Sequence, residues 1–222
     1  TVSLTVSGDG GTDEEIKTDY ITVYAPVTAN FTATPSSGVG PLTVSFTDNS
    51  TGDYSSWSWD FGDADNSTEQ SPSHQYTAPG VYTVSLTVSG DGGTDEETKT
   101  DYITVYAPVT ANFTAAPTSG VAPLNVSFTD ASTGDYSLLS WDFGDGGSST
   151  LANPSYAYTT PGVYTVSLTV SGDGGTDEEI KTDYITVYTP VTANFTATPT
   201  SGVAPLTVNF TDASTGDYSS WS

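Results

Sequence analysis

Apolar and polar residues alternate in short runs along this chain. In 2–6, 42–46 and 57–61, for example, the residues valine, leucine, phenylalanine and tryptophan alternate with serine, threonine or aspartate. A period of two places one face of a strand in a core and the other in water. Segments rich in glycine, proline and aspartate, such as 35–38 and 48–53, separate the runs. No segment has a convincing helical period, so the pattern predicts an all-β chain folded as antiparallel β-sandwiches.

The whole pattern returns every 82 residues without an insertion or deletion, so that Phe31 recurs as Phe113 and Phe195. A period of this length corresponds to one domain per repeat. We therefore expect a string of like sandwiches, each just large enough to bury a core of its own. The expected divisions are the last hairpin of one repeat, two complete repeats and the opening strands of another: 1–25, 26–107, 108–189 and 190–222.

The junction between repeats is short. The hairpin of residues 1–24 is followed by only Ala25 and Pro26 as a linker before the strand that carries Phe31. Proline fixes one backbone dihedral, so neighbouring domains are expected to be held in a nearly fixed, end-to-end relation. Neither terminal segment can close a sandwich alone, and we expect further chain or neighbouring molecules to supply the missing strands.

The charge balance narrows the choice of partners. Asp and Glu number 27 against 3 lysines and no arginine, which gives a net charge of −24. Such a chain repels nucleic acid and anionic membranes, so we expect no nucleic-acid partner, and charged partners should be cations. No stretch resembles a signal peptide or a membrane span, and we expect no direct membrane insertion in this segment. The sequence has no cysteine and no methionine, and it reads as an interior piece of a longer protein.

One motif carries a family resemblance. Trp59-Asp60-Phe61-Gly62-Asp63 is followed by a Pro-Gly-Val-Tyr segment at 79–82, and both recur 82 residues later. Upstream of the motif, each repeat carries a Gly-x-x-Pro-Leu-x-Val-x-Phe-x-Asp segment. By these motifs the chain resembles tandem PKD (polycystic kidney disease) domains over its whole length. The resemblance implies immunoglobulin-like sandwiches that serve as extracellular, cell-surface spacers or interaction modules. Similar tandem units occur in archaeal surface-layer proteins, notably of methanogens, and in appendages of secreted proteases and chitinases.

The motif also has a structural interpretation of its own. Trp59 and Phe61 alternate toward a core, and Gly62 allows a turn where a side chain would collide. Asp60 and Asp63 flank this turn and are expected to accept hydrogen bonds from its free amides, in preference to a metal-binding or catalytic role.

Catalysis is not expected. The only histidine, His74, is replaced by Tyr156 in the next repeat, and no other imidazole base accompanies the serines and threonines. We interpret His74 as a surface loop residue. The acidic residues lie in predicted turns without a glycosidase pattern, so neither catalytic residues nor a required cofactor are predicted.

Calcium is the one metal that the sequence suggests. Acidic side chains crowd the glycine-rich tip of the repeated hairpin, and Ca²⁺ prefers six to eight oxygen ligands. The spacing is not that of an EF-hand, and a solvated acidic tip or a salt-adapted surface gives the same composition. Some PKD-like domains of collagenases bind calcium, although the resemblance does not assign these positions. The candidate calcium ligands are Asp9, Asp13, Asp91, Asp95, Asp173 and Asp177.

Potential N-glycosylation sites are frequent. Seven of the eight asparagines begin an Asn-x-Ser/Thr triplet, and Asn153 fails because Pro154 follows it. Three sites are predicted on the outward face of strands and two in loops, and all seven should be accessible. If the protein is exported, we expect N-linked glycans on at least some of these sites. The sites are Asn30, Asn49, Asn66, Asn112, Asn125, Asn194 and Asn209.

Two further features concern the repeats. Lys17, Lys99 and Lys181 occur once per repeat, so a lysine isopeptide crosslink is conceivable, but an exposed strand residue is the simpler interpretation. Residues 26–107 and 108–189 differ at 18 positions, of which 11 lie within 56–78. Either this segment is a tolerant loop, or the constant hairpin makes a repeated contact between domains or chains.

Two functions remain open. The first is a non-catalytic structural protein, in which stiffly linked domains form a rod, sheath or filament and bind copies of the same chain, for example by lateral pairing of edge strands. The second is a stalk of a surface adhesin or secreted hydrolase, which holds another domain away from the cell or presents Trp57 and Trp221 to surface glycans. A catalytic or carbohydrate-binding domain elsewhere in the full-length protein would favour the second, whereas dozens of further copies of the repeat would favour the first.

Overall fold

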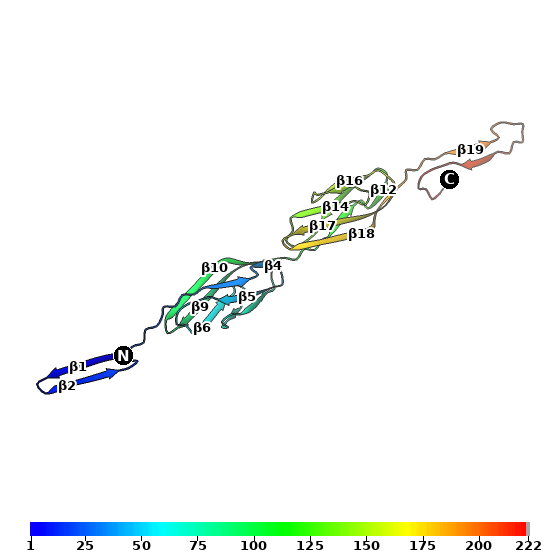
Figure 1. The fold of residues 1–222 in the computed structure, drawn as a ribbon. Helices are drawn as coiled ribbons and strands as arrows, with labels where there is room; N and C mark the ends of the chain where they lie inside the picture. Colours follow the sequence, from blue (N-terminus) through cyan, green and yellow to red (C-terminus); the bar gives the residue numbers. More distant parts are fainter. Residues whose placement is uncertain (221–222) are drawn as a thin grey trace. The chain divides into compact units, whose positions relative to one another are not determined.

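The computed structural model describes residues 1–220, and these contain strands, turns and connecting segments but no helix (Figure 1). The prediction of an all-β fold is confirmed. The chain divides into two units, Thr1–Val105 and Tyr106–Ser222, which are described separately below.

In the first unit, two sheets enclose one core. Phe31, Val44 and Tyr76 reach this core from one sheet, and Trp59 and Leu86 reach it from the other. The smaller sheet has the strand order β3 (Phe31–Thr34), β5 (Leu42–Asp48) and β8 (Ser73–Tyr76). The larger has the order β4 (Ser37–Val39), β10 (Gly93–Tyr106), β9 (Gly80–Gly90), β6 (Ser56–Asp60) and β7 (Asn66–Ser67).

The second unit repeats this arrangement. The smaller sheet has the order β11 (Phe113–Ala116), β13 (Leu124–Asp130) and β16 (Ser155–Tyr158). The larger has the order β12 (Ser119–Val121), β18 (Gly175–Tyr188), β17 (Gly162–Gly172), β14 (Leu138–Asp142) and β15 (Ser148–Ser149). The pairing of β12 with β18 departs from the antiparallel prediction, because these two strands run parallel. Only residues 117–118 separate β11 from β12, and over this step the chain changes sheets.

The remaining strands form two hairpins, β1 (Val2–Gly8) with β2 (Gly11–Lys17), and β19 (Phe195–Thr198) with β20 (Asn209–Asp212). Residues 1–24 have the same sequence as 165–188, yet Leu4 is 66% exposed whereas its copy Leu168 is fully buried. The second strand of the first hairpin ends at Lys17 and not at the predicted Tyr24. In the equivalent strand β10 the pairing continues further, and Val105 pairs with Gly80 of β9. The 222 residues contain no partner equivalent to Gly80 for the first hairpin.

Each core is built around one tryptophan. The ring centroid of Trp59 lies 5.2 Å from that of Phe31 and 5.4 Å from that of Phe46, and its Nε1 donates a hydrogen bond to the carbonyl oxygen of Glu69 at 2.9 Å. Trp141 repeats these contacts, with Nε1 2.8 Å from the Leu151 carbonyl oxygen. Aromatic pairs at these separations add to the free energy of apolar burial. The alternation in the sequence therefore predicted the residue around which each core is built.

Replacing Trp141 tests whether the two cores are independent. Trp141→Ala should destabilise the second domain by about 3 to 5 kcal/mol, because it removes a 1% exposed side chain and leaves a cavity. Differential scanning calorimetry should show one early transition for this domain and an unchanged transition for the first. Leu138→Ala, in the same strand but at a 66% exposed side chain, is the matched control and should change little. Equal shifts of both transitions would contradict independent cores.

Candidate functional site

The single histidine, His74, lies in a strand of the sandwich and not in a surface loop as predicted. His74 lies in β8 two residues before buried Tyr76, so the period of two turns both side chains inward. Its ring stacks on Phe61 at a centroid separation of 4.3 Å, and Nε2 lies 2.7 Å from Oδ2 of Asp63. Among the described residues no serine or threonine hydroxyl is hydrogen bonded to this imidazole.

The turn after Trp59 is braced by the carboxylates of Asp60 and Asp63, as the sequence predicted. The N–H of Gly62 donates to Oδ1 of Asp60 at 2.9 Å, and the N–H of Asp65 donates to Oδ1 of Asp63 at 3.2 Å. Gly62 has a φ of +82°, and a Cβ there would collide with the backbone carbonyl of Thr83. Only glycine fits this close approach.

A set of polar contacts that the sequence did not reveal joins the two sheets at one edge. β3 is an edge strand, so the backbone groups on its outer side have no strand to pair with. Three side chains of β10, in the opposite sheet, bond to this outer side of the chain. Oδ2 of Asp95 accepts from the N–H of Ala29 at 2.8 Å, Nζ of Lys99 donates to the carbonyl oxygen of Phe31 at 2.6 Å, and the hydroxyl of Tyr102 accepts from the N–H of Ala33 at 3.1 Å. We call Asp95, Lys99 and Tyr102 the β3 seal.

The second domain carries the same seal on β11. Asp177, Lys181 and Tyr184 bond to Ala111, Phe113 and Ala115 at 2.8, 2.6 and 3.1 Å. The ammonium of Lys181 also lies 4.8 Å from the centroid of the Phe113 ring, which adds a cation–π contact. The sequence contained a sign of this seal. A charged residue recurs at every second position from Asp177 to Lys181, and these positions lie on the face of β18 that turns toward the core.

This arrangement corrects the interpretation of the lysines. Lys99 and Lys181 are half-buried and not freely exposed, and each ammonium is held by a backbone carbonyl. Within the described residues no carboxylate lies within 4.0 Å of either ammonium. Lys99 and Lys181 therefore lack the contact that an isopeptide crosslink to aspartate needs. Lys17, in the hairpin of β1 and β2, is exposed.

The calcium candidates are not brought together by the structure. Asp95 and Asp177 point a carboxylate oxygen at a backbone N–H of the seal, whereas Asp91 and Asp173 lie exposed in the hairpin turns. Asp9 and Asp13 are exposed in the first hairpin. In residues 1–220 the one group of three or more His, Cys, Asp or Glu side chains that could share a metal ion lies elsewhere, at Asp63, Asp65 and His74. Calcium at the hairpin tips remains a prediction.

All seven candidate glycosylation sites have exposed asparagine side chains. Asn125 lies in β13 and Asn209 in β20, as predicted, whereas Asn66 lies in the short strand β7 and not in a loop. Asn30, Asn112 and Asn194 immediately precede a strand, and Asn49 follows β5. Occupancy by glycans remains a prediction.

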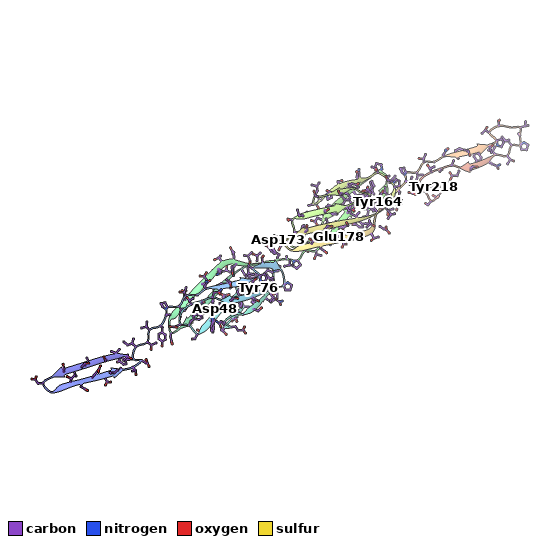
Figure 2. The ribbon with its side chains drawn as sticks, viewed as in Figure 1. Asp48, Tyr76, Tyr164, Asp173, Glu178 and Tyr218 are labelled. Carbon is purple, nitrogen blue, oxygen red and sulfur yellow. The ribbon has the colours of Figure 1, made fainter. Side chains whose placement is uncertain are left out.

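Trp57 is not the exposed platform for glycans that one hypothesis required. Its side chain is half-buried, its Nε1 donates to Oδ2 of Asp48 at 2.7 Å, and its ring meets Tyr54 edge-on. Asp48, which is labelled in Figure 2, lies in the first domain. It also accepts from the Tyr54 hydroxyl at 3.0 Å and from the N–H of Ser50 at 2.9 Å. In the second domain Leu139 replaces Trp57. Trp221, the other residue of that hypothesis, lies outside the described residues.

These contacts set the ionisation of Asp48. Burial acts to raise the pKa of Asp48, but the hydrogen bonds from Ser50, Trp57 and Tyr54 outweigh it and hold the pKa below the ordinary value of 3.8. The carboxylate is therefore favoured in the folded domain and links β5 to β6.

Each domain also holds the residue that precedes it at the junction. In the second unit, Oδ2 of Asp135 accepts from the N–H of Ala107 at 2.6 Å, and the N–H of Asp135 donates to the carbonyl oxygen of Ala107 at 3.1 Å. The carbonyl oxygen of Asp135 accepts in turn from the N–H of Gly174 at 2.8 Å. Asp53 makes the same three contacts in the first unit, to Ala25 and Gly92.

Within residues 1–220 there is no helix with the length and apolarity to cross a membrane.

Comparison with known proteins gives consistent results. A family model described as "PKD domain" matches residues 25–105 and 106–187. The pre-pro-metalloprotease PrtV of Vibrio cholerae is 38% identical over 71 residues, which cover 32% of this chain and 8% of the protease. Among solved structures, the PKD1 domain of Vibrio anguillarum Epp is 37% identical, covers 37% of this chain and 99% of that one, and has a TM-score of 0.32. The ectodomain of mouse nectin-like molecule 4 is 11% identical over 85% of this chain and 82% of that one, with a TM-score of 0.46.

Lys99 tests the energetic role of the β3 seal. Lys99→Met should destabilise the first domain by about 1 to 3 kcal/mol, because the Phe31 carbonyl loses its charged partner. Denaturant unfolding measures the loss, and hydrogen exchange should show faster opening of β3. Lys17→Met changes the same residue in a copy where it is exposed, and should have little effect. Equal effects of the two variants would contradict a specific seal.

Asp48 tests the link between ionisation and stability. Because the pKa is lowered in the folded domain, the carboxylate contributes stability above pH 3.8, and this contribution is lost as the pH falls through the folded pKa. Asp48→Asn should therefore lower the melting temperature of the first domain at neutral pH, and the difference from the unaltered chain should shrink below pH 3.8. Calorimetry over a pH series measures this, with Asp91→Asn as an exposed acidic control. A difference that stays constant with pH would argue against the ionised Asp48.

Proposed function

Since the chain belongs to the PKD domain family, whose model matches residues 25–105 and 106–187, we propose that it is a non-catalytic structural spacer in which tandem PKD domains form a rod. PKD domains are typical of extracellular or secreted proteins, so the proposal places the rod outside the cell, at its surface. Two separate hydrophobic cores support it, because each domain buries a core of its own.

The observation that carries the proposal is the anchoring of the junction residue. β10 ends at Tyr106, and the next residue, Ala107, is bonded through both its N–H and its carbonyl oxygen to Asp135. This leaves no residue of free linker between the last strand of one domain and the first hydrogen bonds of the next. Pro108 follows at once and removes further backbone freedom. A linker of this kind favours a stiff spacer over a flexible tether.

A specific observation favours a stalk as the setting of this rod. The 71 residues matched in PrtV belong to a pre-pro-metalloprotease, and they make up only 8% of it. A PKD segment in such a protein accompanies a different domain that carries the activity named. By analogy, the present rod would hold an adhesive or hydrolytic domain away from the cell surface.

The other setting is a filament, sheath or surface layer built from copies of the same chain. The hairpins differ only where Thr98 replaces Ile16 and Ile180, so they offer nearly the same surface in each repeat, which supports this reading. The sealed edge of β3 opposes it, because the edge groups that a neighbouring strand would need are already bonded. Assembly through copies of the chain, an archaeal surface layer and bound surface glycans remain predictions.

Stiffness at the junction can be measured directly, because the chain has no cysteine of its own. Thr43→Cys and Asn125→Cys introduce spin labels at equivalent exposed positions of the two domains. Double electron–electron resonance should give one narrow distance distribution. Asp135→Ala should broaden it, because Ala107 then loses its hydrogen bond to the carboxylate.

Asp53→Ala is the matched control for this experiment. It removes the same contact at the junction that precedes the first domain, so the distance between the labels should not change. A broad distance distribution in the labelled chain without either aspartate substitution would refute the stiff spacer, whatever the two variants show.

A further inference from the structure

In the first domain, three side chains that can ligate a metal ion lie close together at the turn after Trp59. One ligand atom each from Asp63, Asp65 and His74 lies within 4.8 Å of the others. Asp63 and His74 are half-buried, with side chains 19% and 11% exposed, whereas Asp65 is exposed. The cluster therefore lies at the surface, with its imidazole and one carboxylate already fixed by the fold.

Packing on both sides fixes the imidazole. The ring of His74 is stacked on Phe61 with an interplanar angle of 4° and meets the ring of Tyr76 edge-on at 4.6 Å. Nε2 is thereby directed at the turn, 2.7 Å from Oδ2 of Asp63. Oδ1 of the same carboxylate accepts from the backbone of Asp65, which holds the third side chain at the cluster.

The second domain shows that this cluster is one of two alternative ways to brace the turn. Tyr156 replaces His74, and its hydroxyl donates to Oδ1 of Asp145 at 2.8 Å. Gly147 replaces Asp65, and a Cβ at Gly147 would overlap the Tyr156 hydroxyl. A side chain at position 147 is therefore sterically incompatible with Tyr156 as the second domain places it, and the chain pairs aspartate with histidine in one domain and glycine with tyrosine in the other. Only the first pair places a ring nitrogen and a second carboxylate at the turn.

We propose that Asp63, Asp65 and His74 bind a single Zn²⁺ ion. Zinc takes imidazole nitrogen and carboxylate oxygen together, whereas Ca²⁺ and Mg²⁺ prefer oxygen alone. Tetrahedral coordination with bonds of about 2.0 to 2.1 Å separates two ligand atoms by about 3.3 Å. Nε2 of His74 and Oδ2 of Asp63 therefore have to move apart from 2.7 Å by a few tenths of an ångström, as the ion replaces the proton between them. Solvent takes the fourth position.

The ion would brace the turn of the first domain only. It would join β8 to the loop between β6 and β7, the segment in which the two repeats differ most. This site is distinct from the acidic hairpin tips and does not depend on the function proposed above.

Zinc binding is tested on the untagged 222-residue chain by isothermal titration calorimetry. We expect one Zn²⁺ per chain, and the single histidine should report it through a shift of its ring nitrogen signals in the NMR spectrum. The double variant Asp65→Gly/His74→Tyr copies the pair that the second domain already accommodates, so the fold should be retained. It should weaken zinc binding by about tenfold or more. Asp91→Asn, an exposed acidic control, should bind zinc as the unaltered chain does.

The reciprocal variant Gly147→Asp/Tyr156→His should install a second site and raise the stoichiometry to two. Excess Ca²⁺ should not displace the zinc. The proposal is overturned if the unaltered chain shows no saturable zinc binding, if Asp65→Gly/His74→Tyr keeps the full affinity, or if the ring signals of His74 do not respond.

Discussion

Both domains depend on contact between their two sheets, because neither sheet can bury its apolar face alone. The chain contains its own demonstration in two copies of one sequence. Val166, Leu168 and Val170 are fully buried in β17, whereas their counterparts Val2, Leu4 and Val6 are 43 to 66% exposed in a hairpin without a second sheet. The strand forms in both settings, but the apolar contribution to stability arises only where the sandwich is complete.

The same contact explains the polar part of the fold. β10 lies in the larger sheet, yet Asp95, Lys99 and Tyr102 reach across to the edge of β3. Asp48 links β5 of one sheet to Trp57 in β6 of the other. In the described residues no buried side-chain polar atom lacks a hydrogen-bond partner. Side chains thus bond the sheets together at positions where main-chain pairing ends.

Sequence alone was informative where one residue and its neighbours decide the outcome. Alternation placed Trp59 and Phe61 in the core, and the aspartates around Gly62 indicated the braced turn. It failed where a side chain reaches another sheet. Lys99 was expected in solvent because acids surround it in the sequence, and His74 was expected in a surface loop. The contacts of these two side chains with Phe31 and Phe61 depend on how distant segments pack together, and the local pattern does not indicate them.

The near identity of the repeats also has a consequence for folding. A hairpin such as β9 and β10 has a copy of almost the same sequence in the next domain, so a newly made chain can pair strands from different repeats and become trapped. The segment 56–78 is where an exchanged segment would differ most from the native one, because it holds 11 of the 18 differences between the repeats. With Leu139 in place of Trp57, Asp48 would lose its indole donor. The divergence of this segment therefore gives each domain a means to distinguish its own strands from those of its neighbours.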